Sequence, residues 1–228
     1  MNKQDVSGLP YGLIVSCQAY PGEPMQVASI MAAIAQAAVL GGAVGIRAQG
    51  LADIHAVREA VSVPVIGLVK IGTDGVFITP TVAVCVEVAA AGADIVALDG
   101  TTRLRPDRSS VRDCVEAVHQ HGKLVLADCG SVEDAEHSLA AGSDFVATTL
   151  AGHTPARPKT NGPDFELLER LIAIADVPVI AEGGVRTPAD AVRCLELGAH
   201  AVVVGTAITH PTSITRTFAQ EMARRSPR

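Results

Sequence analysis

Residues 177–206 read VPVIAEGGVRTPADAVRCLELGAHAVVVGT, and this stretch indicates the class of fold. Residues 179–181 and 201–204 are short, continuous apolar runs, which is the pattern of parallel strands covered on both faces. The segment TPAD (187–190) between them is a strong helix start, with a capping threonine, a proline at the first helical position and an acid at the third. Gly198 then ends that helix. The stretch therefore predicts a strand, a helix and a second parallel strand.

A glycine-rich turn follows each of these two strands. Gly183 and Gly184 follow the first, and Gly205 and Thr206 follow the second. Glycine lets the backbone approach a ligand closely, and the backbone N–H groups of such turns can bind a phosphate. In a (β/α)8 barrel, the turns after the last two strands commonly do so. We therefore predict a phosphate site here, and tight turning alone is the alternative.

The rest of the chain repeats this unit. The phrases GGAVGIR, AGADIVALD, AGSDFVATT and LGAHAVVVGT mark helix-to-strand turns, with glycines at positions 42, 92, 142 and 198, so successive turns lie 50, 50 and 56 residues apart. A period near 50 built from two strand–helix units favours a closed parallel barrel. The predicted strands cover residues 13–18, 43–47, 65–70, 95–99, 124–128, 145–148, 179–181 and 201–204. Helices are expected between them, and a last one over 212–224, in a single domain spanning residues 1–228.

Composition excludes several classes of protein. Hydrophobic residues make up 48% of the chain and tryptophan is absent, so the core must consist mainly of Ala, Val, Ile and Leu. The net charge of −6, with no basic cluster except Arg224-Arg225, argues against a nucleic-acid partner. No apolar run reaches the roughly 18–20 residues that span a bilayer, so no membrane partner is expected. Residues 1–12 lack the apolar core of a signal peptide.

Cysteines and histidines give little sign of a special site. The cysteines are odd in number, and none is arranged as C-x-x-C, which is typical of buried thiols in a reduced, cytoplasmic protein. No pair of histidines has metal-ligand spacing, so we expect no metal. The five cysteines are Cys17, Cys85, Cys114, Cys129 and Cys194.

The carboxyl ends of the predicted strands carry most of the chemistry. In this fold the active site lies at those ends. Seven of the eight apolar strands finish on a polar residue and the eighth on a glycine. The alternative is that some of them only cap loops or pair with one another, above all Asp99 and Asp128. These residues are Gln18, Arg47, Lys70, Asp99, Asp128, Thr148, Glu182 and Gly205.

Lys70 and Glu182 are the strongest catalytic candidates. Lys70 rises from the apolar wall of residues 66–69, and Arg47 lies on the adjacent strand. Partial desolvation and that positive charge would lower the pKa of Lys70 and free a neutral amine. Such an amine can remove a proton from carbon next to a carbonyl, or form a Schiff base as in an aldolase. Glu182 is the expected acid and base toward sugar oxygens. A third alternative is a regulatory barrel that binds a sugar phosphate without chemistry.

The motifs resemble those of the N-acylglucosamine-6-phosphate 2-epimerases. They cover nearly the whole chain in order, and LIVSCQ, ALDGT and VIAEGG are the most specific. The matching phrases include GLIVSCQ (12–18), AVGIRAQG (43–50), VPVIGLVK (63–70), ADIVALDGTTRLRP (93–106), TTLAGHT (148–154), VIAEGG (179–184) and VGTAIT (204–209).

The resemblance implies a ribulose-phosphate-binding type of TIM barrel. Its implied activity interconverts N-acetylmannosamine 6-phosphate and N-acetylglucosamine 6-phosphate without a cofactor, in sialic acid catabolism. It assigns the lysine and glutamate roles of the family to Lys70 and Glu182, and a homodimer is implied too. Substrate contacts fall on Gln18, Arg47, Asp128 and Thr148.

Three positions differ from the family pattern. Ile71, Gly184 and His210 stand where basic residues are common, and all three lie near the phosphate end of the site. A histidine is charged only in part at neutral pH, whereas arginine is always charged. We therefore expect His210 to bind the phosphate in a pH-dependent manner, together with Gly183, Gly184, Gly205 and Thr206.

Overall fold

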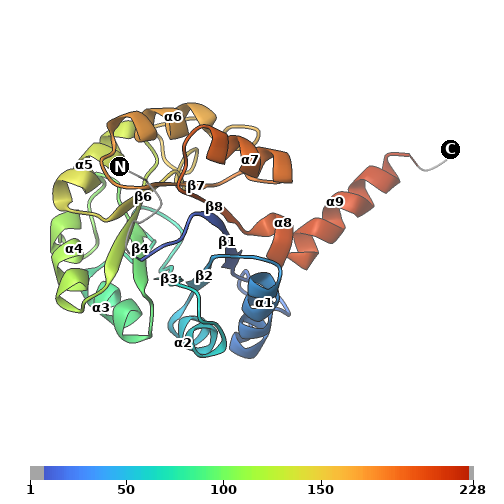
Figure 1. The fold of residues 1–228 in the computed structure, drawn as a ribbon, viewed down its shortest axis with the longest axis horizontal. Coiled ribbons are helices and arrows are strands. Elements are labelled where there is room, and N and C mark those ends of the chain that lie inside the picture. The colour runs from blue at the N-terminus through green and yellow to red at the C-terminus, as the bar shows by residue number, and fades with distance from the viewer. Residues whose placement is uncertain (1–7, 226–228) are drawn as a thin grey trace.

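The strands form a closed barrel in chain order, β1 to β8, as the computed structural model of residues 8–225 shows (Figure 1). Each strand pairs in parallel with the next, and β8 pairs in parallel with β1. The predicted eight-stranded α/β barrel is confirmed. The strands are β1 (Gly12–Cys17), β2 (Gly45–Gln49), β3 (Val65–Leu68), β4 (Ile95–Asp99), β5 (Leu124–Asp128), β6 (Phe145–Ala147), β7 (Val179–Glu182) and β8 (Ala201–Val204).

Helices follow the strands and surround the barrel. They are α1 (Ala28–Leu40), α2 (Leu51–Ala60), α3 (Val82–Ala90), α4 (Val111–Gln120), α5 (Val132–Ala141), α6 (Phe165–Ile174), α7 (Pro188–Glu196), α8 (Thr206–Thr209) and α9 (Pro211–Ala223). The sequence analysis expected one helix after β8, whereas the structure has a four-residue helix and then a long one. Pro211 separates them because proline suits the first helical position and cannot continue a preceding helix.

Local side-chain hydrogen bonds fix where several helices begin. Thr187 accepts from the backbone of Asp190, and the Asp190 carboxylate accepts in return from the backbone of Thr187. Ser110 and Asp113 form the same capping box at the start of α4. Each pair satisfies N–H groups that the first turn of a helix leaves without partners. The signal read from residues 187–190 is therefore confirmed.

The inside of the barrel is a packed apolar layer with polar residues above it. Successive strand residues face opposite sides of a sheet, so every second residue points into the barrel. The buried interior cluster includes Ile14, Ile66, Ile95, Leu126, Phe145, Ile180 and Val203. Two residues beyond these apolar positions on β1, β5 and β7, the alternation places Ser16, Asp128 and Glu182. The apolar layer closes the barrel below and leaves the polar layer at the carboxyl ends.

The segment around Lys70 differs from the prediction. The sequence pattern extended the third strand to Lys70, but β3 ends at Leu68. Lys70 instead forms an isolated antiparallel bridge with Ile78, and the Thr79 backbone N–H donates to Val69 at 2.7 Å. The chain turns back at residues 71–77, so this returning segment competes for the hydrogen bonds that would lengthen β3. Lys70 is held at the barrel mouth by its own loop.

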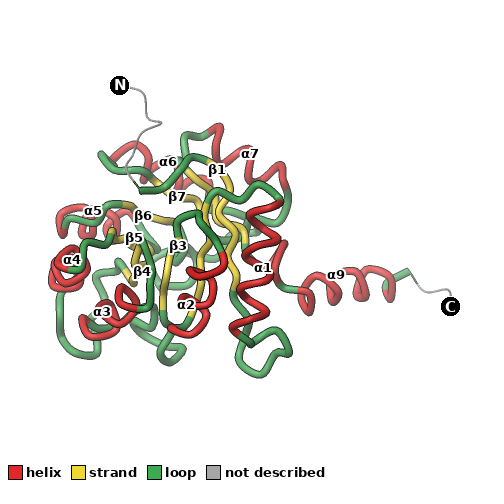
Figure 2. The backbone as a smooth tube through the Cα atoms, turned by 60° about the horizontal axis from the view of Figure 1, so that its bottom comes forward, coloured by secondary structure: helices red, strands yellow, loops and turns green. Residues whose placement is uncertain are grey.

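Helix α9 lies apart from the barrel. It extends away from the ring of helices, and Figure 2 shows the same projection from a second direction. None of its residues is buried, and Phe218 and Met222 are 68% and 71% exposed. Ile214, Phe218 and Met222 follow one another at four-residue spacing, which puts them on one face of the helix. The fold thus ends in a helix that covers nothing in its own barrel.

Candidate active site

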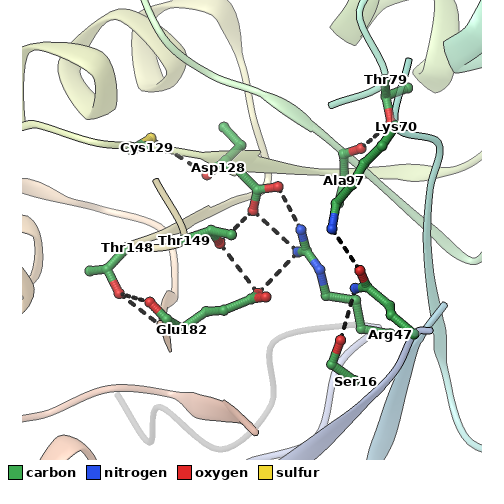
Figure 3. Close-up of polar contacts among 12 residues, drawn as sticks. Ser16, Arg47, Lys70, Thr79, Ala97, Asp128, Cys129, Thr148, Thr149 and Glu182 are labelled. Carbon is green, nitrogen blue, oxygen red and sulfur yellow. Dashed lines mark hydrogen bonds and ion pairs between the residues drawn. The ribbon is translucent and has the colours of Figure 1, made fainter. Parts of the chain in front are cut away.

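A buried arginine connects two carboxylates at the carboxyl ends of the strands (Figure 3). Arg47 from β2 donates two hydrogen bonds to Asp128 from β5, at 3.1 and 2.6 Å. Its Nη1 also lies 3.2 Å from Oε2 of Glu182 from β7. Arg47 is 1% exposed and Asp128 is fully buried. The two-pronged pairing fixes the plane of the guanidinium and crosses the barrel from one wall to the other.

Two adjacent threonines hold the carboxylates in place. Thr149 lies within hydrogen-bonding distance of both acids, with its hydroxyl 2.6 Å from Asp128 and 3.2 Å from Glu182. Thr148 makes a different set of contacts, donating to the backbone carbonyl of Glu182 and accepting from its N–H. The sequence analysis expected Thr148 to contact substrate, but its hydroxyl is already bound to the backbone. Thr149 is the threonine that meets the acidic side chains.

Thr149 and Thr79 were missed in the sequence analysis. The sequence signal for Thr149 is the doublet TT at 148–149, of which only Thr148 lies at the end of the predicted strand. Thr79 accepts from the backbone of Val69 and donates to the carbonyl of Ala97 at 2.6 Å. It has a positive φ of 44°, which is rare for a β-branched residue. Thr79 therefore fixes the backbone that carries Lys70, and no sequence pattern announces that contact.

Lys70 reaches the same region from the other side of the barrel. Its amine donates to Oε1 of Gln18 at 2.8 Å, and the amide of Gln18 donates to the hydroxyl of Ser16. In Figure 3 the Lys70 amine and the Arg47 guanidinium point to one space. Four of the predicted residues, Gln18, Arg47, Lys70 and Glu182, thus come together with Asp128 at the mouth. Their roles in binding and catalysis remain predictions.

The surroundings of Lys70 lower its pKa. The side chain reaches solvent, but barrel atoms crowd it on most sides. This desolvation lowers the pKa first, and the charge of Arg47 lowers it further, whereas Glu182 and Asp128 partly oppose the change. Both leading causes disfavour the ammonium form. A larger fraction of Lys70 is then a neutral amine at neutral pH, as general-base chemistry requires.

Glu182 is shifted in the opposite direction. Burial raises the pKa of its carboxyl, and the nearby charge of Asp128 adds to that, although Arg47 and Lys70 oppose it. For Arg47, burial alone lowers the pKa, but the charges of Asp128 and Glu182 outweigh burial and raise it. Arg47 therefore stays charged. A base with a lowered pKa and an acid with a raised one meet in one site, which suits proton transfer to and from a carbonyl compound.

The two glycine turns lie where the sequence analysis placed them. Gly183 and Gly184 have positive φ values of 103° and 72°, a backbone conformation that glycine adopts without strain. Gly205 precedes α8, and Thr206 is its first residue. Within residues 8–225, the backbone N–H groups of these four residues have no hydrogen-bond acceptor. Those donors remain available to an anion.

Contacts around Gly184 and Gly205 explain why neither residue has a side chain. A Cβ on Gly184 would overlap the carbonyl of Gly162 in the loop before α6. A Cβ on Gly205 would lie 3.2 Å from Cβ of Ser16, which is tighter than usual van der Waals contact. Each turn is therefore packed against a second loop or strand, so close packing accounts for both glycines independently of any ligand.

Both nitrogens of the His210 ring lie next to protein groups. Its Nδ1 lies 2.7 Å from the hydroxyl of Ser213, and its Nε2 lies 2.7 Å from the carboxylate of Glu23. The ring also packs edge-on against Tyr20. Both ring nitrogens thus meet groups in the β1–α1 loop and in α9. His210 therefore links these two segments, and its contact with the phosphate stays a prediction in which the phosphate would compete with Glu23.

Asp99 lies outside the cluster as well. Its carboxylate accepts hydrogen bonds from the backbone and hydroxyl of Thr101 and pairs with Arg103. Burial raises its pKa, although these contacts partly offset the effect. Asp99 therefore caps the loop after β4, whereas Asp128 takes part in the central site. Of the two alternatives to a catalytic role, Asp99 fits the capping of a loop, and Asp128 fits pairing with another strand-end residue, Arg47.

Neither a metal-ligand cluster nor a membrane span was found in the part of the chain that the structure describes. No group of three or more His, Cys, Asp or Glu residues among residues 8–225 could hold a metal ion. No described helix is long and apolar enough to cross a membrane. All five cysteines are buried free thiols.

Comparisons with known proteins agree on one family. The family model described as "Putative N-acetylmannosamine-6-phosphate epimerase" matches residues 31–224. A relative from Cutibacterium acnes, named "Putative N-acetylmannosamine-6-phosphate 2-epimerase", is 53% identical over 93% of this chain and 94% of its own length. A relative of the same name from Caldanaerobacter subterraneus is 46% identical over 96% of this chain and 94% of its own length. The solved structure of the N-acetylmannosamine-6-phosphate 2-epimerase from Clostridium perfringens is 42% identical, covers 92% of each chain and superposes with a TM-score of 0.88.

Proposed function

Because the chain belongs to the N-acetylmannosamine-6-phosphate 2-epimerase family, we propose that it interconverts N-acetylmannosamine 6-phosphate and N-acetylglucosamine 6-phosphate. The observation that carries the proposal is the pairing of opposite pKa shifts at one site. Lys70 has a lowered pKa and Glu182 a raised one, and Arg47 lies beside both. The alternatives, an aldolase and a regulatory barrel, are not favoured by the relatives.

The proposed reaction transfers a proton at carbon 2 of the open-chain sugar. The neutral amine of Lys70 removes the proton, and the electrons of the C–H bond move onto the C1 carbonyl oxygen. Glu182, whose buried carboxyl has a raised pKa that favours its protonated form, donates to that oxygen. Glu182 then takes the enol proton back as carbon 2 receives a proton on its opposite face, either from the Lys70 ammonium after rotation about the C2–C3 bond or from a second acid, and the epimer results. Arg47 stabilises the negative charge that develops, because it is a fixed cation in a buried position.

Gln18 and Thr149 position the reacting groups in this proposal. Gln18 accepts from the Lys70 amine and so directs it into the mouth of the barrel. Thr149 bridges Asp128 and Glu182 and keeps their side chains apart from one another. Asp128 neutralises Arg47 in part and holds it by two hydrogen bonds. Substrate contacts are therefore proposed for Gln18, Arg47, Asp128 and Thr148, and Thr149 is added because its hydroxyl lies next to both acids.

A coupled assay with N-acetylmannosamine 6-phosphate tests the reaction directly. Epimerisation in deuterated water should place deuterium at carbon 2 of the product, because the proton removed exchanges with solvent. Borohydride added with substrate should trap no adduct on Lys70. Retention of the original hydrogen would contradict proton abstraction, and a trapped adduct would favour the aldolase chemistry instead.

The glycine turns are proposed to hold the phosphate of the substrate. Gly183, Gly184, Gly205 and Thr206 offer backbone N–H groups without acceptors, which is typical of an anion site. Gly205→Val would crowd Ser16 and fill this space, so the Michaelis constant should rise and inhibition by inorganic phosphate should weaken. An unchanged response to inorganic phosphate would place the substrate phosphate elsewhere.

A homodimer is proposed from the exposed face of α9. Ile214, Phe218 and Met222 form an apolar stripe in which Ile214 is half-buried and Phe218 and Met222 are exposed. Apolar side chains are also exposed on the first and seventh helices, with Leu40 at 90% and Val192 at 53%. Burying such a stripe against another protomer removes apolar area from water.

The oligomeric state tests this proposal. Wild type should sediment at twice the mass of one 23.4 kDa chain. Phe218→Glu should shift the equilibrium to the monomer, because it places a charge in the apolar contact. Gln220→Glu, which adds the same charge two residues away on the helix, should not. A wild-type monomer, or equal effects of the two variants, would rule out α9 as the contact.

The metabolic role and the compartment follow as further proposals. The substrate named for the family supports a role in amino sugar metabolism, and we propose sialic acid catabolism as the pathway. Five buried free thiols are typical of proteins in the reducing cytoplasm. Fractionation of cells that express the full chain would test that location.

A further inference from the structure

A cavity lined by arginines lies outside the proposed active site, beside the start of α4. It has a volume of about 250 Å³ and is lined by Thr101, Thr102, Arg103, Leu104, Arg105, Arg108, Ser109, Ser110, Val111 and His137. Three arginines and a histidine line it, and no carboxylate does, although the chain as a whole carries a net charge of −6. Asp99 pairs with Arg103 at 2.7 Å, so Arg105 and Arg108 are the two lining arginines without an ion pair among the described residues.

The arginines have donors that protein groups do not use. Arg105 is 3% exposed, and two of its nitrogens donate to the carbonyls of Thr79 and Asp99. Its Nε, also buried, has no partner among the described residues. Arg103 uses Nε and Nη2 for Thr101 and Asp99, and Arg108 is exposed at the rim with no ion pair within residues 8–225. A buried donor without an acceptor is costly, so it points to a ligand.

The first turn of α4 adds to the same positive field. Val111 is the first residue of that ten-residue helix and lines the cavity, and the position of its N–H leaves it without an intrahelical acceptor. The partial positive charge of a helix N-terminus favours anions. Two acids lie close by: Asp107 accepts from Ser109 and Val82, and Asp113 is engaged in the capping box, so both carboxylates have protein partners and neither lines the cavity. The arginines and the start of the helix thus both favour a negatively charged ligand.

We infer that this cavity binds a phosphate group, either free or as the monoester of a small molecule. Arginine offers paired N–H donors that match phosphate oxygens, and the serine and threonine hydroxyls supply further donors. The volume is below the roughly 300–1,000 Å³ of pockets that enclose drug-sized ligands, so a phosphate with a small substituent fits it. Residues at the start of α4 line the cavity, and Figure 1 shows α4 on the opposite side of the barrel from α9. The inference rests on these residues alone and is independent of the proposed activity.

Inorganic phosphate added to the 15N-labelled full chain provides the test. The backbone amide of Val111 should shift saturably, whereas potassium chloride at the same ionic strength should leave it in place. Arg108→Glu should weaken the apparent affinity at least tenfold, because it puts a carboxylate at the rim. Arg112→Glu, on the same helix but outside the lining, should change it less than twofold. The amide of Gly205 reports the barrel mouth separately, so the two sites can be told apart.

Parallel titrations identify the source of the phosphate. A hexose 6-phosphate that shifts Val111 at lower concentration than inorganic phosphate would identify a monoester, and equal concentrations would identify free phosphate. Either result supports the site. Shifts of Val111 that chloride reproduces, or equal losses in Arg108→Glu and Arg112→Glu, would overturn it, because general charge screening would then explain the response. Loss of turnover in the assay above, with the Val111 response intact, would count only against the proposed activity.

Discussion

Lys70 is the residue on which the proposed chemistry depends most. It carries the only amine that the structure places beside Arg47 and Glu182 among the described residues, and its pKa is lowered. Lys70→Ala should reduce kcat by a factor on the order of 10²–10⁴ or more, the usual contribution of a general base. Lys123→Ala, at the far end of the barrel strands, is the matched control and should keep full activity. The coupled assay measures both, with circular dichroism to confirm folding. Activity of Lys70→Ala within tenfold of wild type would exclude the lysine as base.

The charge of Arg47 sets part of the pKa of Lys70, which makes the pH dependence informative. Activity rises with pH as Lys70 loses its proton, and a lowered pKa moves that rise to lower pH. Arg47→Gln removes a positive neighbour and leaves two carboxylates, so the pKa of Lys70 should increase and the rise should move to higher pH. Arg47→Lys keeps the charge and should leave the midpoint near that of wild type. Profiles of kcat/KM against pH for the three proteins give these midpoints. Equal midpoints for Arg47→Gln and wild type would show that a group other than Lys70 titrates in this pH range.

The Thr149 hydroxyl has a measurable role through Glu182. It lies 3.2 Å from that carboxylate and favours its charged form. Thr149→Val should raise the pKa of Glu182 further, and should lower kcat by about tenfold to a hundredfold, since a hydrogen bond to a charged group contributes about 1.5–3 kcal/mol. Thr149→Ser retains the hydroxyl and should restore most activity. The comparison uses kcat and the alkaline limb of the pH profile, on which the proposed acid Glu182 loses its proton. A Ser variant as slow as Val would mean that the methyl group, not the hydroxyl, matters.

At the scale of elements, the turn after β7 and the loop before α6 support one another. Gly184 has a positive φ, and a side chain there would overlap the backbone of Gly162. Gly184→Ala should therefore lower the free energy of unfolding by more than the roughly 1–2 kcal/mol that a left-handed conformation alone costs. Gly122→Ala isolates that conformational cost, because Gly122 has a φ of 66° with nothing within 4 Å. Urea denaturation of both variants gives the difference. Equal losses would show that the two loops can move apart freely.

At the scale of the whole molecule, the exposed helix α9 connects stability to association. If two copies bury its apolar stripe, the thermal midpoint must rise with protein concentration, because association stabilises the folded state by mass action. Phe218→Glu should remove most of this dependence, and Gln220→Glu should preserve it. Calorimetric scans over a hundredfold range of concentration measure the effect. A midpoint that does not depend on concentration in wild type would contradict a dimer held by α9.

The sequence by itself determined the barrel and most of its working positions. Continuous apolar runs can only be strands covered on both faces, and a fixed period of strand–helix units leaves few ways to bury them. Once the strands close into a barrel, their carboxyl ends must meet, so Gln18, Arg47, Lys70 and Glu182 could be placed at one mouth before any contact was known. Local signals such as the capping box at Thr187 worked because their partners are three residues away.

Only the tertiary structure decided which neighbouring polar residue faces which partner. Asp99 and Asp128 end adjacent strands in the same register, yet one caps a loop and the other pairs with Arg47. Thr148 and Thr149 alternate in direction, and His210 turns to Glu23, which is remote in sequence. Helix α9 has the composition of a covering helix but extends into solvent. Each of these outcomes depends on contacts between segments far apart in the chain, and a local pattern carries no information about them.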